Sequence, residues 1–330
     1  MTCLPRCLVR LFALCLAGIA AAAPAQPQSS DWPSRPITYV APYPAGSPVD
    51  LIARRIGQGL QRRLGQPVVV DNRVGAGGTV GTAFVAKASA DGYTIVAGSI
   101  STHAINASLY PRLAYDPVKD FAPVTYVGST ALVLVVNPAV LPVASVQEFV
   151  AYAKAHPGQV QYGSAGNGSS LHLAGELFKS QAKADLSHIP YKGSTGAMND
   201  LLGGQIGAMF ENLPNALPHI QSGRLRALAV TSPRRAAALP AVPTVAETVA
   251  PGYEMLTWHA VLAPAGTPQA VVTKLDAAIR AVLSQPEEQA FFAARSIDIT
   301  PGGPEQLRAL IAREIPKWRA IVRESGATVD

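Results

Sequence analysis

Short β-rich runs alternate with helical segments along most of this chain, and a Gly/Ser/Pro-rich turn follows nearly every run. A β-rich run at 37–41 is followed by a helical segment at 48–64, and a second run at 68–70 is followed by a helical segment near 80–88. Strands that alternate with helices are typical of parallel sheets covered by helices on both faces. The pattern therefore predicts an α/β fold with its ligand-binding loops at the carboxyl ends of the strands.

A second series of the same kind follows residue 130. We expect further strands at 94–98, 132–136, 160–163, 187–189, 206–210 and 226–231, and further helices from 145, at 169–181, at 195–202, from 267 and at 304–324. Pro316 should kink the last helix. The length of 330 residues suggests two domains. We predict lobe 1 at 32–130 plus 250–330 and lobe 2 at 131–249, joined by two crossings that permit hinge closure.

The N-terminus carries an export signal pattern. Arg6 and Arg10 precede an apolar run of 12 residues at 11–22, and Ala23-Pro24-Ala25 then gives a small-x-small cleavage site. The run is too short for a membrane span, which needs about 20 apolar residues. We therefore predict a secretory signal peptide at 1–25, cleaved near Ala25, and an exported mature protein.

Composition and missing motifs exclude several classes of function. All three cysteines (Cys3, Cys7 and Cys15) lie in the predicted signal peptide, which excludes thiol catalysis and thiolate metal sites from the mature chain. The formal charge is +6, yet the basic residues are scattered and no aromatic–basic pattern indicates nucleic acid. No G-x-S-x-G, P-loop or H-E-x-x-H motif is present. We therefore predict that the protein is not an enzyme and uses no cofactor or metal.

The histidines are dispersed along the chain, and a structural or surface role is commoner for such residues than a role as a catalytic base. They are His103, His156, His172, His188, His219 and His259.

A glycine-rich segment follows the second predicted strand. Gly75-Ala-Gly77-Gly78-Thr-Val-Gly81 resembles a dinucleotide-binding fingerprint, but its last spacing is one residue too long for G-x-G-x-x-G. The acidic residue expected about 20 positions later is not clearly placed after a strand. A tight turn with close helix–sheet packing explains these glycines better than a nucleotide site does.

Polar loops of small residues precede four predicted helices. They are Tyr43 to Ser47, Gly98 to His103, Gly163 to Ser170, and Tyr191 to Ser194. In the first loop, Ser47 is a candidate N-cap and Asp50 completes an S-x-x-D box. Each loop offers N–H groups at a positive helix end, and simple capping would explain any one of them. Four such loops at strand ends favour a ligand site for an anion that needs no arginine.

An ordered set of motifs resembles one known family. The motifs are Trp32-Pro-x-Arg35-Pro36, Pro42-Tyr-x-x-Gly46, Asn72-Arg73, Gly75-Ala-Gly-Gly78, Asp91-Gly-Tyr-Thr94, Thr102-His-Ala-x-Asn106, Gly163-Ser-Ala-Gly-Asn-Gly168, His172-Leu-Ala-Gly-Glu176, Pro190-Tyr-Lys-Gly193, Leu201-Leu-Gly-Gly204, Pro243-Thr-Val-x-Glu247 and Ala263-Pro-x-Gly-Thr-Pro268. Together with the export signal, this set resembles the Bug-type periplasmic solute-binding receptors of tripartite tricarboxylate transporters across nearly the whole mature chain.

The resemblance implies a periplasmic-binding-protein type II fold, with two α/β lobes and a hinged ligand cleft, in the periplasm. It implies capture of a small organic acid, mainly by backbone N–H groups and bridging waters, and its delivery to a two-component membrane permease. The cleft loops map onto 43–50, 99–106, 164–172 and 191–194, together with the residue after Phe210. The ligand-binding residues expected there are Tyr43, Gly46, Ser47, Asp50, Ser99, Thr102, His103, Ser164, Gly166, Asn167, Ser169, Ser170, His172, Tyr191, Lys192, Gly193 and Glu211.

Three positions depart from the family's pattern. Ser47 replaces the second glycine of a first-loop pair, and Glu211 is one methylene longer than the usual aspartate. Val74 replaces a proline and should affect only the turn. A carboxylate at 211 repels ligand anions unless it meets a ligand ammonium, a ligand hydroxyl or a protein donor, for which Lys192 is the candidate. Ser47 and Glu211 therefore bear on ligand size and identity.

Three other functions share some of these features. A secreted hydrolase is disfavoured by the missing nucleophile motifs. The effector domain of a transcription regulator shares the type II fold, but the signal peptide and the lack of a helix-turn-helix segment disfavour it. A periplasmic receptor that feeds a signalling system stays open beside the transport receptor. We expect a monomer that binds an organic acid and no nucleic acid.

Overall fold

The computed structural model describes residues 32–329, and the predicted signal peptide lies outside these residues. The strands are β1 (Ile37–Ala41), β2 (Val68–Asn72), β3 (Thr94–Ser99), β4 (Phe121–Val136), β5 (Gln161–Ser164), β6 (Ser187–Pro190), β7 (Ala208–Asn212), β8 (Arg226–Val230), β9 (Leu256–Pro264) and β10 (Ile297–Gly302). The helices are α1 (Pro48–Leu64), α2 (Thr79–Ala86), α3 (Asn106–Leu109), α4 (Val146–Ala155), α5 (Ser170–Ala182), α6 (Ser194–Leu202), α7 (Leu213–Gln221), α8 (Val245–Thr248), α9 (Gln269–Leu283), α10 (Pro286–Ala293) and α11 (Pro304–Ser325), with a 3-10 turn η2 (Ala76–Gly78) and a π-helical turn η3 (Ser101–Ile105).

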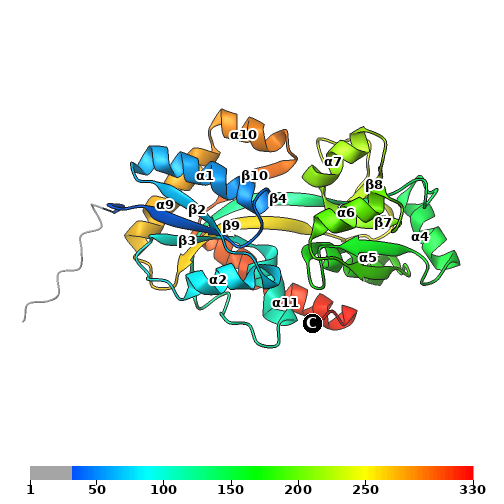
Figure 1. The fold of residues 1–330 in the computed structure, drawn as a ribbon, viewed down its shortest axis with the longest axis horizontal. Helices are drawn as coiled ribbons and strands as arrows, with labels where there is room; N and C mark the ends of the chain where they lie inside the picture. Colours follow the sequence, from blue (N-terminus) through cyan, green and yellow to red (C-terminus); the bar gives the residue numbers. More distant parts are fainter. Residues whose placement is uncertain (1–31, 330) are drawn as a thin grey trace, which may run out of the picture. The chain divides into compact units, whose positions relative to one another are not determined.

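The strands form one mixed sheet that β4 carries from one lobe to the other. Neighbouring strands follow the order β2-β1-β3-β9-β4-β7-β5-β6, and β10 and β8 also pair with β4. Residues 121–131 of β4 pair with β9, whereas residues 132–136 pair with β7. In Figure 1, β4 and β9 run between two groups of helices and strands. The chain therefore forms two α/β lobes that share a long strand.

The sheet is not purely parallel, which corrects one expectation. The strands β1 to β3 and β5 to β7 are parallel sets, but β4 runs antiparallel to β7, β8, β9 and β10. The sequence predicts only the last five residues of the 16-residue β4 and misses β9 and β10. Pro123 and Gly128 argue against a strand, yet the pairing with β9 shifts register beside each of them. Both residues therefore sit at bulges, where a strand tolerates them.

The sequence signals of helix α1 determine where it begins and ends, and so where the loop before it lies. Ile52, Ile56 and Leu60 are buried on one face, as their spacing predicts. Pro48 occupies the first turn, where its missing N–H costs nothing. Gly65 ends the helix with a left-handed φ of 72°. These signals fix where α1 begins, and so where the preceding loop must lie.

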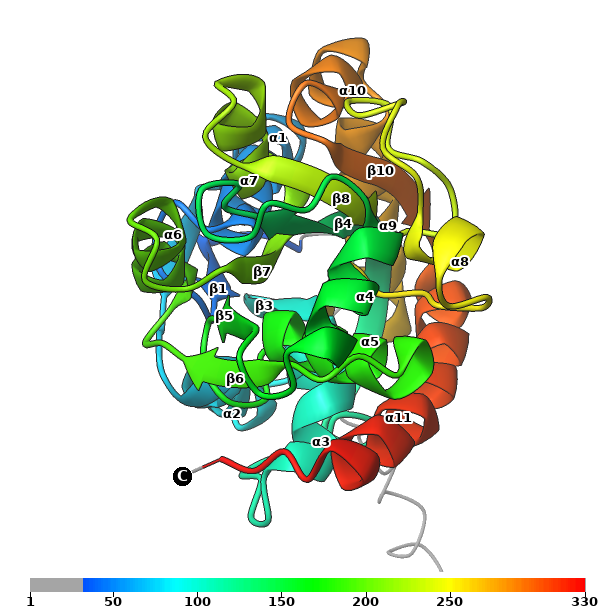
Figure 2. The same ribbon diagram turned by 90° about the vertical axis from the view of Figure 1, so that its right-hand side faces the viewer.

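The last helix, α11, continues through Pro316 as one helix and packs against both α3 and α5, as Figure 2 shows. It thus connects the end of the chain to elements of both lobes. Within residues 32–329, no helix is long and apolar enough to cross a membrane.

Candidate functional site

The carboxyl ends of two parallel strand sets carry the candidate loops. In lobe 1, β1 lies parallel between β2 and β3, so the loops 42–47, 73–78 and 100–106 leave one edge of the sheet. In lobe 2, β5 lies parallel between β6 and β7, so the loops 165–169 and 191–193 also leave one edge. Ligands bind at such edges in open α/β sheets.

Asp50 holds the first loop closed. Its buried carboxylate accepts hydrogen bonds from Gly46 N and Arg54 Nε, each at 2.9 Å, and from Asn72 Nδ2 at 2.8 Å. Burial raises the pKa of Asp50, but these bonds outweigh it and hold the pKa below its usual range. The Ser47 hydroxyl caps α1 by accepting the Asp50 N–H at 3.3 Å. The expected S-x-x-D box is half formed, because the carboxylate bonds to Gly46 N rather than to Ser47 N.

Tyr43 and Ser99 join the first loop of lobe 1 to the loop after β3. Their hydroxyl oxygens lie 2.9 Å apart. Thr102 Oγ1 accepts the Ser99 N–H at 3.0 Å and lies 2.9 Å from His103 Nδ1. A chain of hydrogen bonds therefore runs from the half-buried Tyr43 into the core of lobe 1.

His103 ends this chain in the core. Its ring packs edge-on against Phe121 with 4.8 Å between centroids, and its Nε2 has no hydrogen-bond partner among residues 32–329. Burial lowers the pKa of His103 to about 3, so the ring is neutral at physiological pH. The structure places this expected ligand residue away from solvent, where it supports the π-helical turn η3 instead of lining a surface.

The glycine-rich segment belongs to the same edge, and sequence reasoning missed this. A Cβ on Gly78 would lie 2.8 Å from Thr102 Cγ2 and 3.2 Å from the Tyr43 ring. A Cβ on Gly77 would lie 3.1 Å from the Tyr110 hydroxyl. Helix α2 begins directly afterwards, and no side chain caps it. The signal was present in the sequence, since these glycines stand between a strand and a helix start.

Ser164 organises the loop after β5. Its buried hydroxyl accepts the Gly166 N–H at 3.1 Å and lies 2.6 Å from His188 Nε2. The Ser169 hydroxyl caps α5 by accepting the His172 N–H at 3.2 Å. The loop is therefore shaped by side chains from β5, β6 and its own end.

His172 holds the second half of that loop. Its Nδ1 accepts the Gly168 N–H at 3.0 Å, and its ring stacks on His188 with 3.8 Å between centroids. Burial, and secondarily the charge of Lys179, lowers the pKa of His172 to about 4. Burial is also the main cause that lowers the pKa of His188 to about 3. Both rings are therefore neutral near pH 7, and a neutral ring can accept the N–H.

Four N–H groups that the sequence offers as ligand donors are used inside the protein. The pairs are Gly46 N to Asp50 Oδ2, Ser47 N to Pro44 O, Gly166 N to Ser164 Oγ and Gly168 N to His172 Nδ1. The first turn of α5 keeps two others, because Ser170 N and Leu171 N meet no acceptor within the described part of the chain. The half-buried Asn167 lies in the same loop.

The loop after β6 leads to a helix start without a side-chain cap. The Tyr191 hydroxyl donates to Asp200 Oδ2 at 2.7 Å, which ties the loop to α6. Gly193 has a φ of 112°, a conformation that favours glycine, and no side chain caps α6 there. Lys192 is exposed and forms no ion pair with any described residue.

Glu211 lies at the end of β7 and is 1 % exposed. Its Oε1 accepts from Asn212 N at 2.7 Å, from Asn212 Nδ2 at 3.2 Å and from Asn215 Nδ2 at 3.3 Å. Burial raises the pKa of Glu211 to about 7, although these bonds and the Ser194 hydroxyl lower it. Lys192, the donor expected from the sequence, is not among its partners.

Leu109 and Gly168 bring the two edges together. Leu109 ends α3, next to the lobe 1 loops, and Gly168 lies in the loop after β5. A Cβ on Gly168 would overlap the Leu109 side chain, so this glycine permits the close approach. The residues from Pro33 onward form a single unit, so the contact lies within one body. The candidate site is therefore the pair of strand-end edges that meet at this contact.

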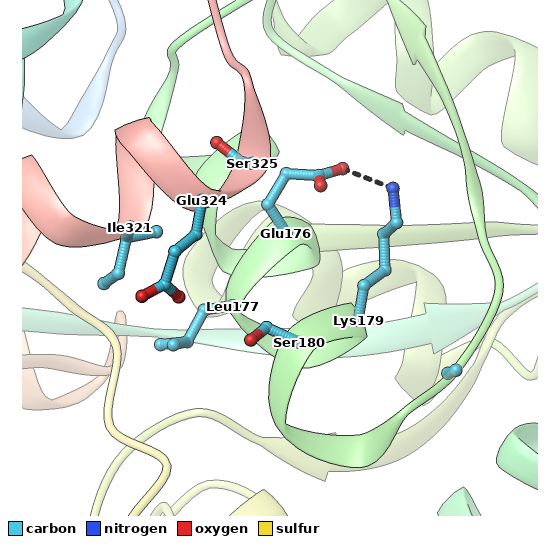
Figure 3. A pocket seen from close by; sticks show the side chains of 8 residues that line it. Glu176, Leu177, Lys179, Ser180, Ile321, Glu324 and Ser325 are labelled. Atoms are coloured by element: carbon cyan, nitrogen blue, oxygen red, sulfur yellow. Dashed lines mark hydrogen bonds and ion pairs between the residues drawn. The ribbon is translucent and has the colours of Figure 1, made fainter.

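A cavity of about 430 Å³ lies away from these edges, between α5 and α11. Figure 3 shows Glu176 and Lys179 of α5, paired at 2.9 Å, with Glu324 of α11 beside Leu177. None of the expected ligand residues lines this cavity. Among residues 32–329, no group of three His, Cys, Asp or Glu side chains is arranged to hold a metal.

Two lobes that share long strands, with helix starts gathered at facing strand ends, define a receptor for a small solute. Residues 52–327 match the model of the tripartite tricarboxylate transporter family receptor, TctC, and the chain belongs to this family.

Known relatives and solved structures agree with this assignment. The chain is 44% identical to protein BugT of Bordetella pertussis, over 97% of this chain and 98% of that one. It is similar to Rhodopseudomonas palustris Rpa4515, solved with adipate, with a TM-score of 0.84, 36% identity and coverage of 90% and 99%. It is also similar to the periplasmic binding protein BugD, with a TM-score of 0.81, 34% identity and coverage of 90% and 99%. These similarities confirm the resemblance to Bug-type receptors and the two-lobe type II fold.

Proposed function

We propose that this protein is a periplasmic solute-binding receptor that captures a small organic carboxylate for a two-component permease of the tripartite tricarboxylate type. The observation that carries this proposal is the start of α5, where Ser170 N and Leu171 N point out of the helix with no acceptor in the described chain. A helix start contributes about half a positive charge together with directed donors. A relative that was solved with adipate supports the class of solute.

Side-chain cations offer a weaker explanation of anion binding here. The loops 43–50, 99–106, 164–172 and 191–194 contain no arginine. Their one lysine, Lys192, is exposed and is not held in place by an ion pair with a described residue. Arg73, at the start of loop 73–78 of the same lobe 1 edge, is already paired with Asp71 at 2.6 Å. Binding by a bidentate arginine fork, the natural alternative for a carboxylate, therefore has no unpaired candidate residue in the loops of these edges.

The lobes close on the solute in this proposal. We propose the boundaries 32–130 plus 250–330 for lobe 1 and 131–249 for lobe 2. The change of pairing partners along β4, from β9 before residue 132 to β7 after it, supports this division. We propose that the functional state is a monomer. If the lobes close, small-angle scattering should show that the protein becomes more compact when a tight ligand binds.

A thermal-shift screen with mono-, di- and tricarboxylates tests the proposed function. A solute at 100 times its Kd should stabilise the protein by about 2.7 kcal/mol. Choline and glucose serve as control solutes that have no carboxylate. If no carboxylate raises the unfolding temperature while another class of solute does, the proposal is wrong. Uptake of the stabilising solute by intact cells, with and without the permease genes, tests the partner.

A further inference from the structure

Glu176 lies one helical turn after His172, on the same face of α5 (Figure 3). Its buried Oε1 accepts the Tyr162 hydroxyl at 2.7 Å and the Lys179 ammonium at 2.9 Å, and it lies 3.8 Å from His172 Nε2. Tyr162 belongs to β5 and lies 3.3 Å from His172 O as well. The carboxylate is therefore held from a strand and a helix, with one oxygen near the imidazole.

The proton of the neutral His172 ring sits on Nε2. His172 Nδ1 accepts the Gly168 N–H at 3.0 Å, so Nδ1 carries a lone pair. In a neutral imidazole the other nitrogen then holds the hydrogen. Nε2 is the atom near Glu176, and 3.8 Å is too long for a direct hydrogen bond. A carboxylate at this distance in a buried site nevertheless stabilises the Nε2–H dipole by its charge.

The other neighbours of the ring do not replace Glu176. His188 stacks on it with 13° between the ring planes, and stacked rings cannot donate in-plane N–H groups to each other. His188 Nε2 lies 2.6 Å from Ser164 Oγ instead. Lys179 is a cation and pairs with Glu176. Among residues 32–329, Glu176 is the one acidic side chain within ion-pair distance of His172.

We propose that Glu176 is a positioning residue for solute capture, which holds the His172 proton on Nε2 and so keeps Nδ1 available to the Gly168 N–H. This proposal rests on the proposed function, because Ser170 N and Leu171 N, the proposed donors to the solute, follow this loop directly. Without the carboxylate, the buried Nε2–H is left unpaired, and moving the proton to Nδ1 removes the acceptor of Gly168. Glu176 thus acts on the solute through His172 and does not touch it.

Calorimetry near pH 7 tests the effect on capture, with adipate or with the carboxylate that stabilises the wild type most. Glu176→Ala should raise the Kd at least about tenfold. Glu176→Gln keeps an oxygen that can accept from Tyr162 and face Nε2–H, so its Kd should stay within about fivefold of the wild type. Glu314→Ala is the matched control. It removes a buried carboxylate of α11 that accepts Trp318 Nε1 at 2.9 Å, and it should leave the Kd unchanged.

Nitrogen-15 spectra of the His172 ring show which nitrogen carries the proton, and they need no solute. The wild type, Glu176→Gln and Glu314→Ala should show the Nε2–H form, whereas Glu176→Ala should also populate the Nδ1–H form. A purely structural carboxylate would not change this signature. If Glu176→Ala does not fold, Glu176→Met fills the space without an acceptor and takes its place.

Three results overturn the role of Glu176. They are a proton on Nδ1 in the wild type, wild-type affinity in the folded variant without an acceptor, and lost affinity with the Nε2–H form unchanged. If the wild type binds no carboxylate, the proposed function fails, whereas the spectra still show whether Glu176 sets the position of the proton.

Discussion

His172 Nδ1 accepts the N–H of Gly168 at 3.0 Å, so one neutral imidazole sets the shape of the loop that leads into α5. The acceptor exists only while the ring is unprotonated. The loop geometry, and with it the direction of the free N–H groups that follow, is therefore tied to the protonation state of a buried side chain.

Acid should destabilise the protein partly through His172. The pKa of His172 is about 4 in the folded protein and about 6.5 in the unfolded chain. Its contribution to the free energy of unfolding is therefore complete above pH 6.5 and is lost as the pH falls from 6.5 to 4. For one such group, the free energy of unfolding falls by up to about 1.4 kcal/mol for each pH unit within this range. Asn in place of His172 keeps an acceptor near the Nδ1 position but does not titrate. Urea denaturation between pH 7 and pH 4 should show that the free energy of unfolding falls less steeply in His172→Asn than in the wild type. An equal fall in both proteins would contradict the role of His172.

Gly168→Ala should disturb the contact between the two edges. A Cβ there meets Leu109, and φ is +70°, which disfavours any residue but glycine. Gly158→Ala is the matched control, because φ is +73° and no atom lies within 4 Å of the added Cβ. We expect Gly168→Ala to lower the free energy of unfolding by about 1–3 kcal/mol more than Gly158→Ala does. Leu109→Ala should recover part of that difference in a double-mutant cycle, and strict additivity would count against the contact.

Asp50→Asn should loosen the first loop. The substitution replaces one carboxylate oxygen by a donor, so one of the donors Gly46 N, Arg54 Nε and Asn72 Nδ2 loses its acceptor. We expect a loss of about 1–3 kcal/mol in the free energy of unfolding, because Asp50 is buried. Asp91→Asn, which weakens an exposed pair with Arg35, should cost less than about 1 kcal/mol. Equal losses in the two variants would show that Asp50 is an ordinary surface acid.

Local signals in the sequence were enough to predict the strand and helix that border the first loop of the site. The predicted bounds of β1 and α1 agree with the structure, and Ser47 caps α1 as its spacing indicates. The first eleven residues of β4 could not be predicted, because Pro123 and Gly128 weaken the strand signal and only pairing with β9 stabilises it. Long-range partners decide such a strand, and a single sequence does not show them.

The site could be predicted only as a set of loops. The sequence places polar, glycine-rich segments at strand ends, but it does not show which N–H groups are free. Gly166 and Gly168 depend on acceptors from Ser164 and His172, and Glu211 depends on Asn212 rather than Lys192. These partners are set by the three-dimensional packing of β5, β6 and β7. Which of the remaining loop residues touch the solute stays a prediction.

The most direct test of main-chain carboxylate binding removes one backbone N–H and compares it with a variant that removes only the side chain lost with it. Ser170 is the first residue of α5, a position where proline fits, and the preceding Ser169 has the extended backbone that proline requires. Ser170→Pro deletes the N–H together with the hydroxyl, whereas Ser170→Ala deletes only the hydroxyl, so the difference between the two variants reports the N–H. Lys192→Met removes the one lysine of the loops.

Calorimetric titration of the stabilising carboxylate should give a Kd about 10–150 times higher for Ser170→Pro, since a hydrogen bond to a charged group contributes about 1.5–3 kcal/mol. Ser170→Ala and Lys192→Met should each change the Kd by less than about fivefold. If Lys192→Met abolishes binding while folded Ser170→Pro binds like the wild type, the solute is anchored by lysine and main-chain capture is refuted.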